Sequence, residues 1–311
     1  MSKARDHGGG VDAAAQRYGG TRSQWLDLST GINPAPYPIG TFTDDAWSAL
    51  PDADATKALI DAARKFWNVP KEAAILAAPG ASSLIARIPA LWPTERVSIQ
   101  TPTYNEHAGA FEAHGWQVAE EHQNVQVVVH PNNPTGRLWS TNELTAPLTV
   151  IDESFCDVTP ERSHVARTAN KGTIVLKSFG KFWGLAGLRL GFAIADPDTI
   201  QRLSTMIGPW AVSGPALRIG AAALNDVDWA DATRRKLAQD AARLDTLMTT
   251  KGATCLGGTT LFRLYDVGDA HAWQDRLAQG KVWSRVFPYS DSWLRLGIPA
   301  ADKWNQLKAA L

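Results

Sequence analysis

The sequence is poor in cysteine and has no excess of charge of either sign. Its 311 residues include only two cysteines, Cys156 and Cys255, and 31 Lys and Arg residues balance 31 Asp and Glu residues. Two cysteines are too few for a disulfide framework, so a reducing cytoplasm is the expected compartment. Without a basic surplus, no nucleic-acid partner is expected.

Long hydrophobic runs and metal-ligand patterns are also absent. The longest apolar runs, such as residues 125–129, are strand-sized, whereas a membrane span needs about 20 apolar residues. The first seven residues contain no apolar segment of the kind found in signal peptides. The seven histidines lack the spacing of metal ligands, and His107 and His114 are interpreted as surface or core residues. We therefore expect no membrane association and no metal.

Short apolar runs alternate with helical patterns in the first two thirds of the chain. The predicted strands are Ala74–Ala78, Val97–Gln100, Gln126–His130, Leu148–Asp152, Thr173–Lys177 and Leu190–Ala195. The predicted helices are Asp54–Trp67, Ser82–Leu91, Glu106–His114 and Asn142–Leu144. Such alternation is typical of an α/β domain with a mostly parallel sheet.

The pattern changes after Pro197. Longer helices follow, the clearest at Trp229–Thr249, then strands at Leu261–Tyr265 and Trp293–Gly297 and a last helix from Ala300. This part predicts a smaller α+β domain. The first 40 residues are rich in Gly and Pro and resemble an arm laid over another surface. The sequence therefore predicts an arm and part of the small domain at residues 1–40, a large domain at 41–205 and a small domain at 206–311.

Several polar residues directly follow predicted strands, where parallel α/β sheets bind their ligands. Asp152 ends the apolar run 148–151. A carboxylate buried there needs a partner, and a protonated pyridine nitrogen is a suitable one. On its own, Asp152 is more simply interpreted as a helix or loop cap.

Lys181 lies in a segment rich in glycine and aromatic residues after another predicted strand. A loop lysine is usually solvated, but Ser178 precedes this one by three residues and Arg189 follows it by eight. A hydroxyl and a guanidinium suit a phosphate held close to a lysine that forms a Schiff base. The pattern therefore favours a phosphate-bearing cofactor attached to Lys181.

Two further turns provide ligand-binding groups. Gly80-Ala81-Ser82-Ser83 joins a predicted strand to a predicted helix, where backbone N–H groups and hydroxyls can bind an anion. Residues 130–136 contain two X-Pro steps and a glycine, which fix a rigid turn. Asn133 in this turn could donate a hydrogen bond to a ligand oxygen, and a plain turn is the alternative interpretation.

Taken together, these motifs resemble one enzyme family. The segments Asn-Asn-Pro-Thr-Gly at 132–136, Asp-Glu-Ser-Phe at 152–155 and Ser-Phe-Gly-Lys-(x)7-Arg at 178–189 are similar to the class I/II aminotransferases, fold-type-I enzymes that use pyridoxal 5'-phosphate (PLP). The resemblance covers roughly residues 50–300. It implies an aspartate-aminotransferase-like α/β fold with a mostly parallel sheet in a large domain and a smaller α+β domain.

The resemblance also implies roles for eight residues. Lys181 would bind PLP covalently, Asp152 would pair with the pyridine nitrogen, and Asn133 would bind the ring hydroxyl. The phosphate would be bound by Ala81, Ser82, Ser178 and Arg189. Tyr104 would stack on the ring. Two positions depart from the family pattern, because Phe155 and Leu50 stand where many relatives have tyrosine. The resemblance therefore does not imply a tyrosine donated across a dimer.

The N-terminal arm resembles a narrower group within this family. His7-Gly8-Gly9 and Ser29-Thr30-Gly31-Ile32-Asn33-Pro34 are similar to the start of the threonine-phosphate decarboxylases of cobalamin biosynthesis. This resemblance implies a phosphorylated amino acid as substrate and a homodimeric enzyme. Such a substrate carries a phosphate and a carboxylate, which need at least two cations or equivalent donors. The implied substrate-binding residues are Arg285, Arg295, His7 and Asn33, with Arg295 receiving the carboxylate.

The implied reaction is decarboxylation of L-threonine O-3-phosphate to 1-amino-2-propanol phosphate, with Lys181 returning a proton to Cα. The fold does not choose the reaction. The alternative is therefore an aminotransferase, such as one for histidinol phosphate, which would need a 2-oxo acid. A PLP-binding regulator of transcription is disfavoured, since only about 40 residues precede the PLP domain and they have no basic surplus.

Overall fold

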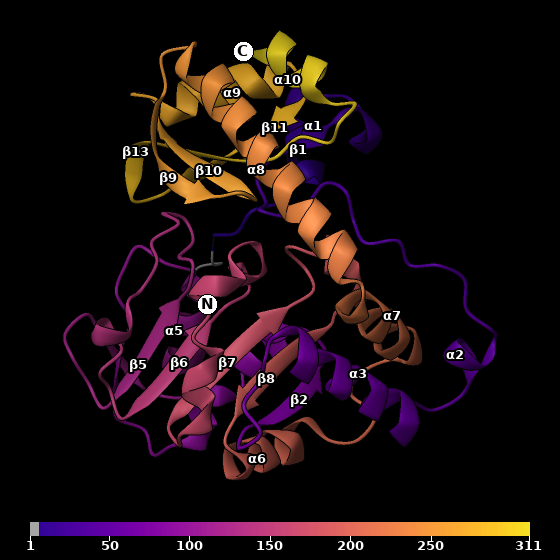
Figure 1. Ribbon diagram of the computed structural model, residues 1–311. Helices are drawn as coiled ribbons and strands as arrows, with labels where there is room; N and C mark the ends of the chain where they lie inside the picture. The colour runs from indigo at the N-terminus through magenta and orange to yellow at the C-terminus, as the bar shows by residue number, and fades with distance from the viewer. Residues whose placement is uncertain (1–5) are drawn as a thin grey trace. The chain divides into compact units, whose positions relative to one another are not determined.

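The computed structural model describes residues 6–311, which form two compact units (Figure 1). The larger unit comprises residues 37–133 and 137–231, and the smaller comprises the residues up to 36, 134–136 and 232–311. The sequence predicts boundaries after residues 40 and 205. The larger unit extends to residue 231 because the chain beyond 205 still packs against it, as the ring contact of Tyr37 with Trp229 illustrates.

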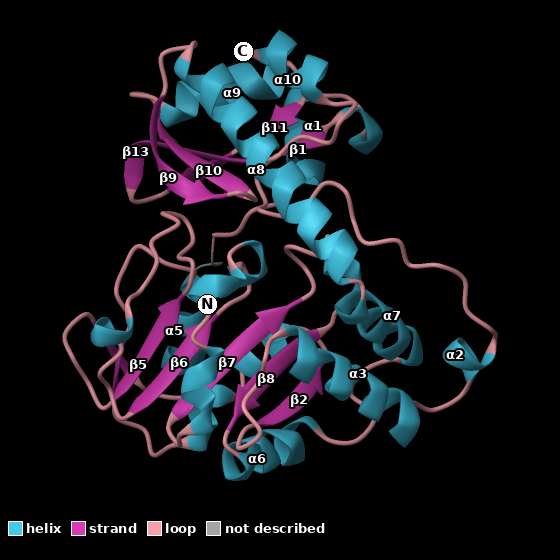
Figure 2. Ribbon diagram, viewed as in Figure 1, coloured by secondary structure: helices cyan, strands magenta, loops and turns pink. Residues whose placement is uncertain are grey.

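The larger unit is built on a seven-stranded sheet in the order β2-β8-β7-β6-β5-β3-β4 (Figure 2). Strand β8 is antiparallel to both of its neighbours, and the other pairs are parallel. The mostly parallel sheet predicted from the sequence is therefore confirmed. The strands are β2 (Ala74–Ala78), β3 (Arg96–Ser98), β4 (Gln117–Ala119), β5 (Val125–Val129), β6 (Leu148–Asp152), β7 (Thr173–Ser178) and β8 (Gly191–Ala195).

Helices of the larger unit bury apolar side chains against this sheet. One core cluster includes Leu84, Phe111 and Leu203 together with Val127 and Val150 of the sheet. The helices are α2 (Asp45–Ser48), α3 (Ala53–Phe66), α4 (Ala81–Ile85), α5 (Asn105–Ala113), α6 (Pro197–Ile207) and α7 (Gly214–Asn225). Short 3₁₀ helices are η2 (Ile88–Leu91), η3 (Thr141–Glu143), η4 (Cys156–Val158), η5 (Pro160–Arg162), η6 (Val165–Ala169) and η7 (Ala186–Leu188).

Helix α3 shows how the sequence determines one of these elements. Asp52 caps its start, with the side chain accepting a hydrogen bond from Ala55 N at 2.6 Å. The helix buries Leu59, Ala62 and Ala63, which lie on one face at helical spacing. It packs against α7, where a Cβ atom on Gly220 would lie 2.8 Å from a methyl carbon of Leu59. The glycine permits this close approach.

The smaller unit combines a four-stranded sheet with helices and the N-terminal arm. Its sheet has the order β12-β13-β10-β9, and every pair is antiparallel. The arm belongs to this unit, since β1 pairs in parallel with β11. The strands are β1 (Leu26–Asp27), β9 (Thr254–Thr259), β10 (Phe262–Asp266), β11 (Val282–Trp283), β12 (Arg285–Phe287) and β13 (Ser290–Gly297). The helices are α1 (Val11–Tyr18), η1 (Arg22–Gln24), α9 (Ala270–Gln279) and α10 (Trp304–Ala310), while α8 (Val227–Thr249) begins in the larger unit. Among residues 6–311, no helix is long and apolar enough to cross a membrane.

Candidate active site

A cavity of about 210 Å³ lies in the larger unit beyond the carboxyl ends of its parallel strands. Its lining includes all eight residues that the sequence assigns to a PLP site: Ala81, Ser82, Tyr104, Asn133, Asp152, Ser178, Lys181 and Arg189. These residues span more than 100 positions of the sequence, and the sheet brings them together because its parallel strands end at one edge.

Asp152 ends β6 and is buried. One carboxylate oxygen accepts hydrogen bonds from the Ser154 N–H and hydroxyl at 2.9 and 2.6 Å, and the other lies 2.8 Å from His107 Nε2. Burial raises the pKa of Asp152, but the hydrogen bonds and the His107 contact outweigh it and lower the pKa on balance. The carboxylate is therefore held in its ionised form.

His107, which the sequence interpretation treats as a surface or core residue, lies in the core and beside Asp152 of the cavity. It is buried on α5 and contacts both Asp152 and the ring of Tyr104, whose centroid lies 6.2 Å away. The spacing offered a signal, because Tyr104 and His107 lie three residues apart at the start of one helix and so share a face. The contact with Asp152 depends on how α5 packs on the sheet, which spacing does not reveal.

Asn132 is a second residue that the sequence interpretation did not single out. Its side-chain oxygen accepts a hydrogen bond from the Thr103 hydroxyl at 2.6 Å, and its amide donates to the carbonyl of Pro102 at 3.0 Å. These bonds tie the loop that carries Tyr104 to the turn that carries Asn133. Asn132 therefore sets the position of two cavity walls at once.

Lys181 is held by an aromatic framework. Phe179, Phe182 and Trp183 flank it in sequence and are fully buried. The Trp183 ring stacks between Phe179 and Trp229, with centroid distances of 5.1 and 5.4 Å. The Lys181 amine itself lies 5.3 Å from the ring centroid of Phe155, the residue that replaces the tyrosine of many relatives. Anchored neighbours thus present a lysine that lines the cavity.

The groups expected to hold a phosphate converge on the turn before α4. A Cβ atom on Gly80, which has φ +82°, would lie 2.6 Å from Nη2 of Arg189. A Cβ on Gly191 would lie 2.3 Å from the Ala81 nitrogen, so β8 also reaches this turn closely. Arg189 adopts a left-handed backbone with φ +52°, which is uncommon for a residue other than glycine. The turn is therefore a cradle lined by hydroxyls, backbone and one guanidinium.

These donors and acceptors fit PLP. Hydroxyls of Ser82 and Ser178 and the Arg189 guanidinium suit its phosphate, the Asp152 carboxylate suits its pyridinium nitrogen, and the Lys181 amine suits its aldehyde.

The residues that the sequence assigns to the substrate all belong to the smaller unit. Arg285 and Arg295 lie directly opposite each other on the antiparallel strands β12 and β13. Arg285 binds the Asp6 carboxylate through both terminal nitrogens, at 2.7 and 2.6 Å, and it also donates to the carbonyl of His7. Asn33 accepts a hydrogen bond from Ala35 N at 3.0 Å, which shapes the turn at Pro34.

Arg295 is buried and donates to the carbonyl of Ser29 at 2.5 Å. Burial and the positive charge of Arg285 lower its pKa to about 10, while Tyr289 and Asp27 act in the opposite direction. Like charges opposite each other in a sheet repel. The two like charges are therefore held side by side, and the Asp6 carboxylate compensates the charge of Arg285.

Comparison with known proteins identifies the family. The family model described as aminotransferase class I and II matches residues 41–311. The chain belongs to this family. It is 40% identical to a threonine-phosphate decarboxylase of a Sinorhizobium species, over 100% of this chain and 98% of the relative. It is also 37% identical to a threonine-phosphate decarboxylase of Pseudomonas aeruginosa, over 98% and 97% of the two chains.

Solved structures of the family share the fold. Histidinol-phosphate aminotransferase from Sinorhizobium meliloti, crystallised in complex with PLP, matches 97% of this chain and 93% of its own with a TM-score of 0.81. Its sequence identity is 18%, so this likeness establishes the fold alone. The aspartate-aminotransferase-like fold predicted from the sequence is confirmed, and the class I and II aminotransferases are PLP-dependent enzymes.

Proposed function

We propose that the chain is a PLP-dependent decarboxylase that converts L-threonine O-3-phosphate to 1-amino-2-propanol O-2-phosphate, a step of cobalamin biosynthesis. The observation that carries this proposal is the full-length identity of 40% and 37% with two threonine-phosphate decarboxylases. The N-terminal arm is included in both alignments, and the PLP cavity supplies the required groups.

The cavity residues divide the work of binding and proton transfer. When bound, PLP supplies a cationic ring that accepts the electron pair left behind when the substrate carboxylate departs as CO2. Asp152, kept ionised by Ser154 and His107, would hold a proton on the ring nitrogen. Lys181 would hold the cofactor through its amine and would be the group that returns a proton to Cα. Buried aromatic neighbours keep the Lys181 segment in place.

The arginine pair of the smaller unit suits the two anionic groups of the substrate. Arg285 already holds one carboxylate, that of Asp6, through two parallel hydrogen bonds, which is the geometry that guanidinium groups take with carboxylates and phosphates. In the proposal, Arg285 binds the substrate phosphate and Arg295 its carboxylate, while His7 and Asn33 add donors. A neutral or singly charged amino acid would satisfy this pair less well.

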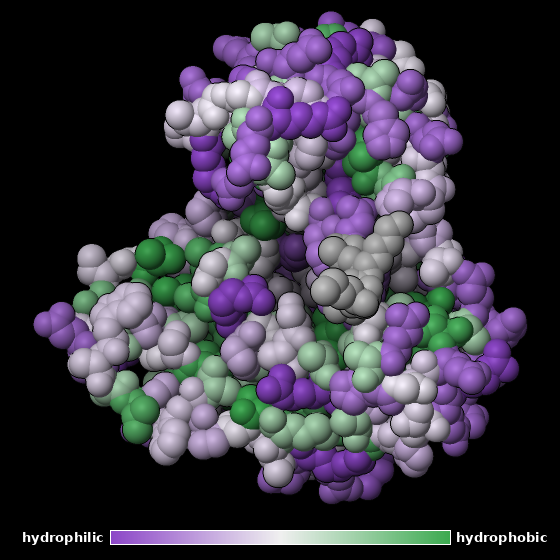
Figure 3. All heavy atoms as spheres, turned by 180° about the vertical axis from the view of Figure 1, so that it is seen from behind, coloured by the Kyte–Doolittle hydropathy of each residue, from purple (hydrophilic) through white to green (hydrophobic). Residues whose placement is uncertain are grey.

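We further infer a homodimer, with the partner copy covering an apolar surface of the larger unit. Trp47, Leu50 and Trp210 expose 73%, 67% and 61% of their surface, a degree unusual for large hydrophobic residues. Trp210 also has the left-handed φ of +53° and lines an apolar hollow with Ile60 and Leu217. Figure 3 shows one face of the molecule, on which hydrophobic residues lie among hydrophilic ones.

The decisive experiment measures CO2 release from L-threonine O-3-phosphate by the PLP-loaded protein without any 2-oxo acid. Equal amounts of CO2 and 1-amino-2-propanol phosphate would support the decarboxylase. Turnover only with histidinol phosphate and 2-oxoglutarate would instead make the chain an aminotransferase. In the control variant Lys181→Ala, the visible absorbance of covalently bound PLP and the CO2 release should both disappear. The matched variant Lys171→Ala, an exposed lysine paired with Asp198, should keep both.

A further inference from the structure

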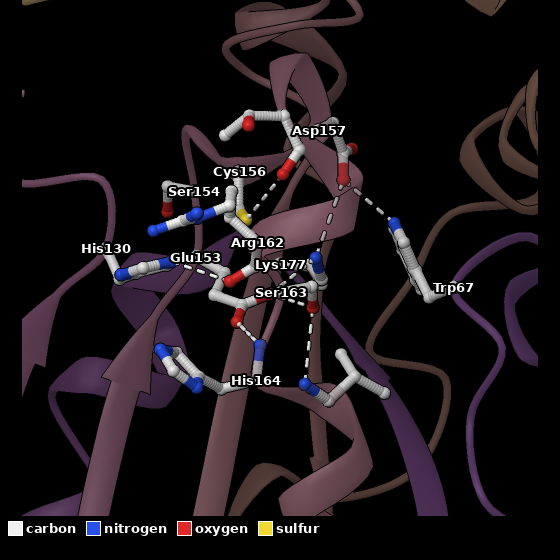
Figure 4. Close-up of polar contacts among 12 residues, drawn as sticks. Trp67, His130, Glu153, Ser154, Cys156, Asp157, Arg162, Ser163, His164 and Lys177 are labelled. Carbon is white, nitrogen blue, oxygen red and sulfur yellow. Dashed lines mark hydrogen bonds and ion pairs between the residues drawn. The ribbon is translucent and has the colours of Figure 1, made fainter. Parts of the chain in front are cut away.

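Behind the cavity, the larger unit contains a buried ionic network (Figure 4). Lys177 of β7 is 1% exposed, and its Nζ lies 2.7 Å from the Glu153 carboxylate and 3.6 Å from that of Asp157. Successive side chains of a strand point to opposite faces of a sheet. Lys177 therefore points away from the cavity that its neighbour Ser178 lines.

Neutral donors complete the network. The indole N–H groups of Trp67 and Trp183 donate to the two oxygens of Asp157, at 2.9 and 3.0 Å. Glu153 accepts from the Ser163 hydroxyl and from the backbone N–H of His164, at 2.6 and 2.5 Å. Figure 4 shows Lys177 between the two carboxylates and the indole nitrogen of Trp67 pointing toward Asp157. Two carboxylates and one ammonium thus share a pocket closed to water.

Lys177 and Glu153 stay ionised despite their burial. Burial lowers the pKa of Lys177, but the nearby Glu153 and Asp157 carboxylates raise it on balance. Burial raises the pKa of Glu153, whereas Lys177 and the surrounding donors lower it on balance. Apolar residues of similar volume are often as stable as a buried ion pair, or more so. Fold stability alone is therefore a weak reason for the chain to contain this network.

Each member of the network adjoins a segment of the cavity wall. Glu153 follows Asp152 directly, and Lys177 directly precedes Ser178. Asp157 holds the indole of Trp183, two residues beyond Lys181. The network therefore connects the three backbone segments that carry the ring-nitrogen partner, a phosphate ligand and the covalent lysine. Supporting contacts of this kind fix the geometry of the groups that touch a ligand.

We propose that Glu153, Asp157 and Lys177 are positioning residues, which hold the ends of β6 and β7 and the Lys181 segment in the arrangement that binds PLP. The inference rests on the PLP binding of the proposed function and does not depend on which reaction follows. Its physical basis is geometric. An ion pair between adjacent strand ends and a carboxylate bridging two indoles restrict the backbone in more directions than apolar packing does.

The test separates positioning from stability by comparing variants with and without PLP. The variants are Glu153→Gln, Lys177→Met and Lys177→Arg. Leu203→Ala, a fully buried residue of α6 in the same unit, serves as the destabilised control. Each protein is shown to be folded by far-UV circular dichroism at low temperature. PLP affinity is then measured by fluorescence titration, Tm is measured with and without PLP, and kcat and KM are measured separately.

A positioning role predicts that Glu153→Gln and Lys177→Met bind PLP about tenfold more weakly. This corresponds to the lower end of the loss in metal affinity that follows when groups orienting metal ligands are removed. The rise in Tm that PLP causes should shrink accordingly. Their kcat should fall by up to about 100-fold, with little change in KM. Lys177→Arg keeps the charge and should recover most of both losses. Leu203→Ala should lower Tm with and without PLP equally and leave PLP affinity unchanged.

The inference is overturned if folded Glu153→Gln and Lys177→Met bind PLP as tightly as the unsubstituted protein. It is equally overturned if Leu203→Ala loses as much affinity as they do, because the loss would then follow from reduced stability. Failure of the unsubstituted protein to bind PLP would overturn the proposed function, and with it the basis of this inference.

Discussion

At the scale of single residues, the contact between His107 and Asp152 shows how a buried charge is kept available for a ligand. Both side chains are nearly inaccessible, with 2% and 3% of their surface exposed. A carboxylate buried at this depth would protonate readily if its partners were removed. His107 and Ser154 prevent this, and so the ring nitrogen of PLP would meet an ionised group.

Replacing His107 by leucine tests this role. The variant removes one hydrogen bond to a buried charged group, which costs about 1.5–3 kcal/mol. The pKa of Asp152 should rise, because one of the groups that lowers it is lost. The proposed reaction needs ionised Asp152, so the acidic limb of the kcat/KM profile should move to higher pH. His114→Gln, at the exposed C-cap of the same helix, is the control. An unchanged acidic limb in His107→Leu would contradict the role.

The residues predicted from the sequence were those whose motifs lie next to strand ends. Lys181, Ser178 and Arg189 share one short segment, so their spacing alone suggested a common ligand. His107 and Lys177 were missed for a different reason. Their partners Asp152 and Glu153 lie 45 and 24 positions away along the sequence (107 to 152 and 153 to 177). Such pairings depend on helix packing and strand register, which single-residue patterns do not determine.

At the scale of elements, the approach of β8 to the turn before α4 controls the shape of the phosphate cradle. The first residue of β8 is Gly191, and an added Cβ would lie 2.3 Å from the nitrogen of Ala81 and 2.7 Å from the carbonyl carbon of Gly80. Both are backbone atoms, so a side chain could fit only if the turn or the strand moved.

Gly191→Ala is therefore expected to weaken both the fold and PLP binding. Forcing an extra methyl group into a packed site costs about 1–3 kcal/mol, and moving the turn would displace Ala81 and Ser82 from the cofactor phosphate. Calorimetry and PLP titration measure the two effects. Gly187→Ala is the matched control, because a Cβ there meets no atom within 4 Å. Equal PLP affinity in the two variants would show that the close approach is unimportant.

Element existence was predicted more accurately than element ends. The strands Ala74–Ala78 and Leu148–Asp152 have the predicted bounds. The helix predicted at Ser82–Leu91 is instead α4 and η2, separated by two residues. Pro89 lies within η2 and cannot donate the backbone hydrogen bond that a continuing α-helix would need. Short edge strands such as β4 were not predicted, because three residues carry too little periodicity to recognise.

At the scale of the whole molecule, the predicted domain boundaries rest on composition, whereas compactness depends on contacts between distant segments. Helix α8 illustrates the difference, because its first residues belong to the larger unit and its remainder to the smaller. Residues 134–136 likewise belong to the smaller unit, within which the Gly258 nitrogen donates to the Thr135 carbonyl at 3.0 Å. A continuous helix and a three-residue segment give no compositional signal of a boundary.

The proposed homodimer predicts a change of mass when its apolar surface is charged. Trp210→Glu places a carboxylate in a surface that association would desolvate, so the protein should become monomeric or dissociate at much higher dilution. Analytical ultracentrifugation measures the mass. Leu256→Glu, at another exposed apolar position but in the smaller unit, should leave the mass unchanged. A dimer that persists in Trp210→Glu would place the interface elsewhere.

The stability of the whole molecule should also depend on His130 as pH falls. His130 is buried beside the network of Figure 4, with Nε2 2.8 Å from the Arg162 carbonyl and Nδ1 accepting from the Trp139 N–H at 3.0 Å. A proton at Nδ1 would face that N–H donor. Burial lowers the pKa of His130 from 6.5 to about 4, with Glu153 acting in the opposite direction.

Because the folded pKa lies below the unfolded one, the contribution of His130 is complete above pH 6.5 and is lost as pH falls toward 4. The total loss is about 3 kcal/mol at 1.36 kcal/mol per unit. Asp152 and Glu153, whose pKa values are lowered by folding, add their own losses only near and below their ordinary values of 3.8 and 4.5. The interval from pH 6.5 to about 5 therefore isolates histidine titration. Denaturant unfolding at several pH values in this interval measures how the free energy of unfolding changes with pH. The slope should be smaller in His130→Gln, since an amide can keep both hydrogen bonds without titrating. An equal slope in the variant would assign the pH dependence to other groups.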